Sequence, residues 1–142
     1  MKRMLASLAF GIALLCSALA AQAGTLVAEI DVGRQTMTVS RGGELLYSWP
    51  VSTGRKGFTT PRGSYRPTRM HKMWHSRKYD MSPMPYSVFF RGGYAIHGTN
   101  YVKALGRPAS HGCVRLHTRN AAKFYSMVRE VGAKNTRIRV VN

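Results

Sequence analysis

Two histidines and one cysteine lie close together in residues 94–116 and could carry out nucleophilic chemistry. His97 ends an apolar run, and His111 lies two residues before Cys113, which itself follows Gly112. A cysteine nucleophile needs a histidine within hydrogen-bonding reach, a group that orients this histidine, and backbone N–H groups that stabilise the oxyanion. Because the segment supplies candidates for each role, it predicts covalent catalysis by Cys113.

Either histidine could be the base. Side chains two residues apart in an extended chain share a face but lean apart, whereas a histidine on a neighbouring strand can face the sulfur directly. This geometry favours His97 over His111. None of the five acidic residues lies within 94–116, so a backbone carbonyl is the natural acceptor for the other ring N–H of the base.

Two other interpretations of Cys113 compete with a nucleophile. A lone cysteine beside valine and leucine is most often a small buried core residue. A metal site is the second, with these candidate ligands: Cys113, His97, His111, His71 and His75. Such a site would lack a second cysteine and a nearby carboxylate, so we expect no metal and no cofactor. The flanking glycine and histidine favour the nucleophile over the inert core residue.

Short β-strands must position these residues. Apolar and β-branched runs predict strands near 26–32, 36–39, 45–51, 87–90, 94–97, 113–116 and 136–141. Glycines at 42–43 and 92–93 indicate hairpin turns. One helix is expected to begin near Thr118 or Asn120, either of which could cap it, and to end at Gly132. The pattern predicts a single, mostly β domain.

Residues 69–85 are basic and aromatic and show no clear periodicity. They end in Ser82-Pro83-Met84-Pro85, and we interpret them as a long connection of the kind that forms binding loops or lids. We expect His71, His75 and His117 to be solvated loop residues.

The first 23 residues have the pattern of a signal peptide. Lys2 and Arg3 precede an apolar run, and Ala21-Gln22-Ala23 places small residues at positions −3 and −1 of a cleavage site. We therefore expect residues 24–142 to be exported, with no stable membrane insertion after cleavage. Cys16 would leave with the signal peptide, so Cys113 would remain a free thiol.

The chain is strongly basic. It has 22 Lys and Arg against five Asp and Glu, a formal net charge of +17 over 142 residues. Such a charge favours polyanionic partners. Because the predicted export signal argues against nucleic acid, we expect wall polymers, lipid headgroups or carboxylate-bearing peptides instead.

The motifs around Cys113 resemble a known family. Ile96-His97-Gly98-Thr99 and Gly106-Arg107-Pro108-Ala109-Ser110-His111-Gly112-Cys113-Val114-Arg115-Leu116 resemble the signature of the L,D-transpeptidase catalytic domain, also called YkuD-type. Residues 50–54 and 59–63 are similar to the first half of that domain. The resemblance covers essentially all of residues 24–142. It implies a β-sandwich-like domain with one main helix near the C-terminus. Such a domain would act in the periplasm or cell wall and contribute to cell-wall organisation and cell shape.

The resemblance also implies roles for individual residues. Cys113 would attack the carbonyl of the third residue of a peptidoglycan stem peptide, release the terminal D-alanine, and pass the acyl group to an amine. His97 would be the general acid/base, oriented by the carbonyl of Gly98, and the N–H groups of Gly112 and Cys113 would form the oxyanion hole. The implied substrate-binding residues are Ser110, His111, Arg115, Met84 and Tyr86.

Two alternative functions stay open at this point. Water could replace the amine acceptor, which would make the protein an L,D-carboxypeptidase or an amidase on the same fold. A non-catalytic cationic protein that binds the cell wall, with an inert Cys113, is the alternative from another class. As a transpeptidase, the protein would cross-link the wall or attach proteins to it. Its partners would be stem peptides, and we expect a monomer.

Overall fold

The computed structural model describes residues 24–142, so the predicted signal peptide at 1–23 and its Cys16 lie outside the described residues. The described part contains these elements in chain order: β1 (Leu26–Asp31), β2 (Thr36–Arg41), β3 (Glu44–Pro50), β4 (Gly63–Tyr65), β5 (Arg69–Ser76), η1 (Arg77–Tyr79), β6 (Ser82–Arg91), β7 (Tyr94–Thr99), η2 (Val102–Ala104), β8 (Val114–His117), α1 (Thr118–Val131), η3 (Ala133–Asn135) and β9 (Thr136–Val141). Within residues 24–142, no helix is long and apolar enough to cross a membrane.

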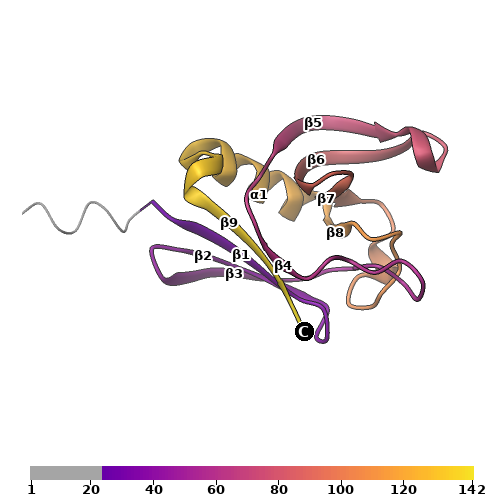
Figure 1. Ribbon diagram of the computed structural model, residues 1–142, viewed down its shortest axis with the longest axis horizontal. Helices are drawn as coiled ribbons and strands as arrows, with labels where there is room; N and C mark the ends of the chain where they lie inside the picture. Colours follow the sequence, from indigo (N-terminus) through magenta and orange to yellow (C-terminus); the bar gives the residue numbers. More distant parts are fainter. Residues whose placement is uncertain (1–23) are drawn as a thin grey trace, which may run out of the picture.

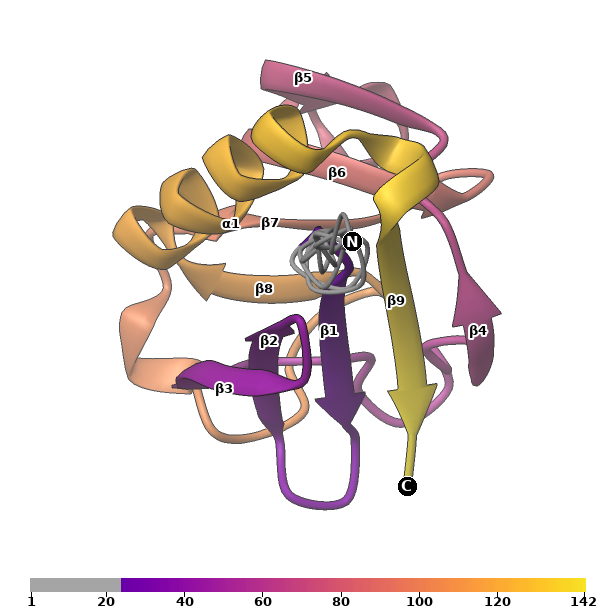
Figure 2. The same cartoon turned by 90° about the vertical axis from the view of Figure 1, so that its left-hand side faces the viewer.

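The strands form two sheets. The five-stranded sheet has the order β3-β2-β1-β9-β4, and the four-stranded sheet has the order β5-β6-β7-β8 (Figure 1). Neighbouring strands are antiparallel except for two pairs, β1 with β9 and β7 with β8, which are parallel. Together with α1, which lies alongside β7 and β8 (Figure 2), the sheets give the mostly β, sandwich-like fold that the sequence predicts.

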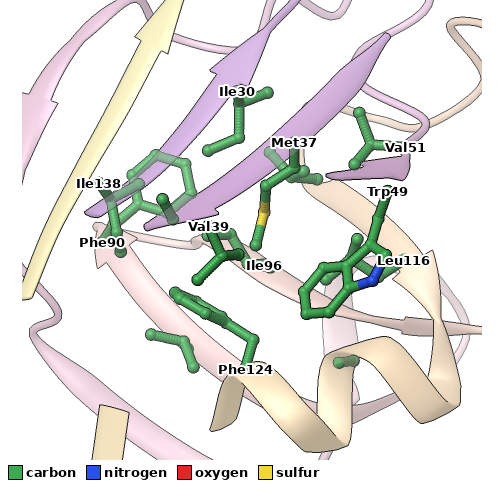
Figure 3. Packing of buried hydrophobic residues seen from close by; sticks show 14 of the residues in the cluster. Ile30, Met37, Val39, Trp49, Val51, Phe90, Ile96, Leu116, Phe124 and Ile138 are labelled. Carbon is green, nitrogen blue, oxygen red and sulfur yellow. The ribbon is translucent and has the colours of Figure 1, made fainter. Parts of the chain in front are cut away.

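One hydrophobic core joins the two sheets and the helix. Alternate residues of β1 and β2 point into it, because successive side chains of a strand face opposite sides. Figure 3 shows Phe124 of α1 pointing into this cluster, near Val39 and Ile96 from the two sheets. Phe124 is fully buried, and its burial stabilises the domain by about 1.5–3 kcal/mol. The core therefore fixes the four-stranded sheet relative to the rest of the domain.

The helix begins as expected but with a different cap. The Nδ1 atom of His117 accepts the N–H of Arg119 at 3.1 Å, so His117 is the N-cap rather than Thr118 or Asn120. His117 is thus the junction between β8 and α1, and the expectation that it is a solvated loop residue was wrong. The helix ends at Gly132, where φ is 86°, as predicted.

The segment 69–85 is a hairpin rather than a long connection. β5 pairs with β6 over residues 69–76 and 82–89, and η1 lies between the two strands near the tip (Figure 1). β5 is an edge strand with no simple alternation of burial, which explains why no period is visible in the sequence. Pro83 and Pro85 lie where β6 pairs with β5 alone, and proline is tolerated where a strand has one neighbour. Both His71 and His75 lie on β5, so the expectation that they are loop residues was wrong. His71 packs 4.7 Å from Trp74, whereas His75 is exposed to solvent as expected.

Candidate active site

The parallel pairing of β7 and β8 determines which side chains share a face. Ile96 lies opposite Val114, and both enter the core. His97 lies opposite Arg115, one residue further along each strand, so both side chains point to the other face of the sheet. Cys113 lies two residues before Arg115 and shares this face. The structure therefore brings His97, Cys113 and Arg115 together on the sheet face that is turned away from the core.

These three residues line a cavity of about 580 Å³. Its walls come from the β5–β6 hairpin, the end of β7 and the loop before β8. The basic residues of the lining are Arg69, Arg77, Lys78 and Arg115. None of the lining residues is acidic, so the cavity offers an electropositive environment to a ligand.

The imidazole of His97 is neutral and is oriented by a backbone carbonyl. Its Nδ1 lies 2.7 Å from the carbonyl oxygen of Gly98, and because a carbonyl can only accept, Nδ1 carries the proton and Nε2 keeps its lone pair. Burial lowers the pKa of His97 to about 4, and the charge of Arg115 adds to this, while the bond to Gly98 partly opposes it. Gly98 is the residue to which the family resemblance assigns this contact with His97.

Cys113 is a free thiol that rests in its protonated form. Its Sγ donates a long hydrogen bond, 3.7 Å, to the carbonyl oxygen of Gly93. Burial raises the pKa of the Cys113 thiol, and a backbone hydrogen bond with Ala95 and the charge of Arg115 oppose this shift only in part. At neutral pH Cys113 is therefore a thiol and His97 a neutral imidazole.

Ser110 stabilises the cysteine loop from within. It is fully buried, and its Oγ donates to the carbonyl oxygen of Cys113 at 2.6 Å and accepts the N–H of Gly112 at 3.0 Å. Ser110 borders the cavity, but its hydroxyl is used inside the loop, so the structure does not present it to a substrate. The N–H of Gly112 donates to this hydroxyl. To act in the predicted oxyanion hole, the N–H would have to share or release its hydrogen bond to Ser110.

Only glycine fits at position 112. Its φ is +120°, and a Cβ there would lie 2.6 Å from Cε1 of Tyr94. The carbonyl oxygen of Gly112 accepts the hydroxyl of Thr60 at 2.8 Å. The tight turn before Cys113 therefore depends on a missing side chain and on a buried threonine from another part of the chain.

Residues 52–60 form the support of this loop, which residue chemistry alone did not reveal. Ser52 exchanges two backbone hydrogen bonds with Arg115, at 3.0 and 2.8 Å. The carbonyl oxygen of Thr53 accepts the N–H groups of Ala109 and Ser110 at 2.9 and 3.0 Å. The family resemblance at 50–54 and 59–63 was the signal in the sequence that could have located this support.

The ring of His111 packs between two aromatic side chains, Tyr79 of the cavity wall and Phe58 outside it. Its ring stacks on Tyr79 with centroids 4.0 Å apart and meets the edge of Phe58 at 4.9 Å. Burial lowers the pKa of His111, and the charges of Arg55, Arg115 and Lys78 lower it further. Because its ring is fixed by stacking, His111 shapes the wall of the cavity.

The two substrate-binding candidates on β6 lie apart. Met84 is buried beside Phe89 and Ala95 and lines the cavity next to Cys113. Tyr86 does not reach the cavity, because its ring packs 5.7 Å from Tyr125 on α1. The φ of Tyr86 is 54°, which departs from extended strand geometry and accompanies a gap in the pairing of β6 with β5. The expectation that Tyr86 forms a wall of the cleft does not agree with this placement.

Arg115 is half-buried and faces the cavity without an acidic partner. Its Nη1 lies 3.4 Å from the carbonyl oxygen of Ala109, and none of the three ion pairs within residues 24–142 includes it. An arginine with no carboxylate beside it can bind one from a substrate. Over the same residues, no group of three His, Cys, Asp or Glu side chains is placed to hold a metal ion.

A family model and a related protein match the sequence of this chain. The family model of the L,D-transpeptidase catalytic domain, YkuD, matches residues 26–140. YkuD of Bacillus subtilis strain 168 is 23% identical over 103 residues, which cover 70% of this chain and 58% of that protein.

Two solved structures are also similar. An L,D-transpeptidase from Mycobacterium smegmatis is 28% identical with a TM-score of 0.72, and the match covers 82% of this chain and 58% of that one. The L,D-transpeptidase LdtMt1, solved in complex with imipenem, is 27% identical with a TM-score of 0.73, covering 82% and 59%. In all three comparisons the match spans less than two thirds of the relative's length.

Proposed function

Because this chain belongs to the L,D-transpeptidase catalytic domain family, we propose that it is a cysteine acyltransferase acting on peptidoglycan stem peptides. One observation supports this most directly: the neutral imidazole of His97 on β7 and the thiol of Cys113, the residue before β8, line the same electropositive cavity. A thiol beside an oriented imidazole is the arrangement that nucleophilic acyl transfer requires.

In the proposed reaction, Nε2 of His97 takes the proton of Cys113 as Sγ attacks the carbonyl carbon of the third stem residue. The tetrahedral intermediate collapses, the C–N bond to the terminal D-alanine breaks, and His97 returns the proton to the leaving amine. The resulting thioester is attacked by an amine of a second stem. His97 removes the amine proton and returns it to the sulfur, which restores the thiol.

The charge of the cavity agrees with this class of substrate. Stem peptides carry several carboxylates, and the lining of the cavity contains four basic residues and no acidic ones. We propose that Arg115 contacts a donor carboxylate, because no acidic residue of the described chain occupies it. The attraction should weaken as salt is added, since screening shortens the range of exposed charges.

The remaining parts of the proposal concern location and organisation. We propose that residues 24–142 form the catalytic domain, that residues 1–23 direct it to the periplasm or cell wall, and that the domain acts as a monomer. An exported location would bring the electropositive cavity to the wall, where its substrates are.

Mass spectrometry of the chain incubated with disaccharide-tetrapeptide tests the reaction. We expect loss of one alanine and formation of cross-linked dimers by the wild type, and neither by Cys113→Ala. His97→Gln should lose at least 100-fold in rate, whereas His111→Gln, a matched histidine of the same cavity, should lose far less. Loss of alanine without dimers would show hydrolysis instead of transfer. If the wild type neither removes alanine nor forms dimers, both reactions are contradicted and a binding protein is favoured.

An acylating probe gives a second readout that needs no acceptor. Imipenem carries a strained β-lactam carbonyl, and LdtMt1 was solved in complex with it. We expect the intact mass of the wild-type chain to rise by one imipenem and that of Cys113→Ala to stay unchanged. An adduct on both proteins would show that Cys113 is not the nucleophile.

A further inference from the structure

Gln35 occupies a strained position at the end of the turn between β1 and β2. Its φ is 51°, in the left-handed region that disfavours residues with a Cβ, and only 4% of its surface is exposed. A glycine or asparagine would adopt this backbone at lower cost. Such strain persists where surrounding interactions over-determine the conformation, so the contacts of this side chain need an explanation.

The amide of Gln35 holds Thr53 from two sides. Its Nε2 donates to Oγ1 of Thr53 at 2.6 Å and to the carbonyl oxygen of Val32 at 2.8 Å, while its Oε1 accepts the N–H of Thr53 at 2.9 Å. The carbonyl oxygen of Gln35 accepts the N–H of Val51 at 2.9 Å. Thr53 is fully buried, so water does not compete for these bonds.

Thr53 in turn holds the loop that carries the nucleophile. Its carbonyl oxygen accepts the N–H groups of Ala109 and Ser110, and the Ser110 hydroxyl donates to the carbonyl oxygen of Cys113. A continuous set of hydrogen bonds therefore runs from Gln35 through Thr53 and Ser110 to Cys113. Gln35, Thr53 and Ser110 are all buried, and the set ends at the loop of the nucleophile rather than in the hydrophobic core.

We propose that Gln35 is a positioning residue of the active site. It fixes Thr53, and through Thr53 and Ser110 it sets the position of the Cys113 sulfur relative to His97. This inference rests on the proposed function, in which the sulfur must meet both the base and a substrate carbonyl. Rates of such reactions are sensitive to displacements of about 1 Å, so a loosened loop should slow the chemical step more than it weakens substrate binding.

Three variants test the proposal in the full chain. Gln35→Met keeps the length of the side chain and removes every hydrogen bond of the amide, and Thr53→Val removes only the hydroxyl that accepts from Nε2. Thr136→Val is the matched control, because Thr136 is a fully buried threonine like Thr53, but it lies on β9 and its hydroxyl donates to the carbonyl oxygen of Gly132 at 2.9 Å, away from the cysteine loop.

We expect Gln35→Met and Thr53→Val to lower kcat about tenfold or more with KM within twofold, and Thr136→Val to leave both within twofold. The melting temperatures of all three variants would show whether a loss of kcat accompanies a loss of stability. If Gln35→Met does not fold, Thr53→Val decides. The proposal would be overturned if Thr53→Val and Thr136→Val lost the same factor in kcat at equal stability. It would also be overturned if Gln35→Met and Thr53→Val raised KM and left kcat unchanged.

Amide hydrogen exchange supplies a readout that does not depend on turnover. The N–H groups of Ala109 and Ser110 should exchange at least tenfold faster in Gln35→Met and Thr53→Val than in Thr136→Val. This measurement remains valid if the protein acts on another substrate, so a failure of the proposed function can be distinguished from a failure of this inference. Unchanged protection at both groups would show that Gln35 stabilises its own turn and nothing more.

Discussion

The hydroxyl of Ser110 donates a 2.6 Å hydrogen bond to the carbonyl oxygen of Cys113, three residues further along the chain. Oγ of Ser110 also accepts the N–H of Gly112 at 3.0 Å, so one buried side chain bonds to the carbonyl of Cys113 and to the N–H of the residue before it. This relationship gives Ser110 a role in shaping the loop, and it makes the serine testable separately from the cysteine and the histidine.

Ser110→Ala should reduce activity and stability together. The substitution leaves the part-buried carbonyl of Cys113 and the buried N–H of Gly112 without their partner, which costs about 1–3 kcal/mol of unfolding free energy. The loop should also relax, and we expect kcat to fall roughly tenfold or more. Ser87→Ala is the matched control, because Ser87 is fully buried and its Oγ donates to the carbonyl oxygen of Met84, three residues earlier, at the same 2.6 Å. If Ser87→Ala lost as much kcat as Ser110→Ala, the special role of the loop would be refuted.

The pH dependence of turnover should show an unusually acidic limb. The pKa of His97 is about 4, and the imidazole accepts a proton only in its neutral form. Therefore kcat/KM should be level from roughly pH 5.5 to 8 and should fall as pH drops toward 4. Initial rates at constant ionic strength would check this. A midpoint near the ordinary histidine value of about 6.5 would contradict the burial of this base.

The same shift makes stability depend on pH. In the unfolded chain His97 binds a proton below about pH 6.5, whereas in the folded protein it binds one only below about pH 4. Acid therefore favours the unfolded state. Stability contributed by this residue is present above pH 6.5 and should decrease by about 2–3 kcal/mol between pH 7 and 4.5. Urea unfolding of the wild type and His97→Gln at both values would measure it. Equal pH dependence in the two proteins would count against the shift.

Local sequence patterns predicted most elements because alternation and turn residues are short-range signals. The strands at 26–31, 36–41, 94–99 and 136–141 and the end of the helix at Gly132 lie close to where these signals placed them. The common face of His97 and Cys113 also followed from strand geometry, since neighbouring strands place such side chains together.

Other features depend on contacts that no local pattern records. The 69–76 strand is an edge strand with exposed side chains, so it carries no periodic signal. Tyr86 turns toward Tyr125 because its backbone leaves the extended region, which its residue type does not indicate. The support of the cysteine loop by Thr53 joins residues more than 50 positions apart through the backbone carbonyl, and a side-chain pattern cannot reveal such a bond.

Gly54→Ala should disrupt this support. A Cβ at position 54 would lie 1.5 Å from the carbonyl oxygen of Phe58, which is backbone and cannot simply rotate away. We expect a loss of about 3 kcal/mol and a decrease in melting temperature of roughly 10 °C. Gly33→Ala is the control, because a Cβ there meets its nearest atom at 3.4 Å, an ordinary contact. Calorimetry of both variants would test it, and similar melting temperatures would contradict the predicted clash.

Arg115→Gln should weaken the binding of the donor stem. Burial lowers the pKa of Arg115, but a guanidinium stays charged at neutral pH, and it faces the cavity without an acidic partner in the described chain. Loss of one charge-assisted contact to a substrate carboxylate, worth about 1.5–3 kcal/mol, should raise KM roughly tenfold or more. Initial rates over a range of tetrapeptide concentrations would show it.

The control for this change is Arg137→Gln. Arg137 is also half-buried, and its Nη1 lies 3.4 Å from the carbonyl oxygens of Lys134 and Thr136, but it does not line the cavity. Its KM should stay within twofold of the wild type. The salt dependence of kcat/KM should also become shallower in Arg115→Gln and remain unchanged in Arg137→Gln, because only the first removes a charge that lines the cavity. If both variants raised KM equally, the net charge of the protein rather than Arg115 would attract the stem peptide.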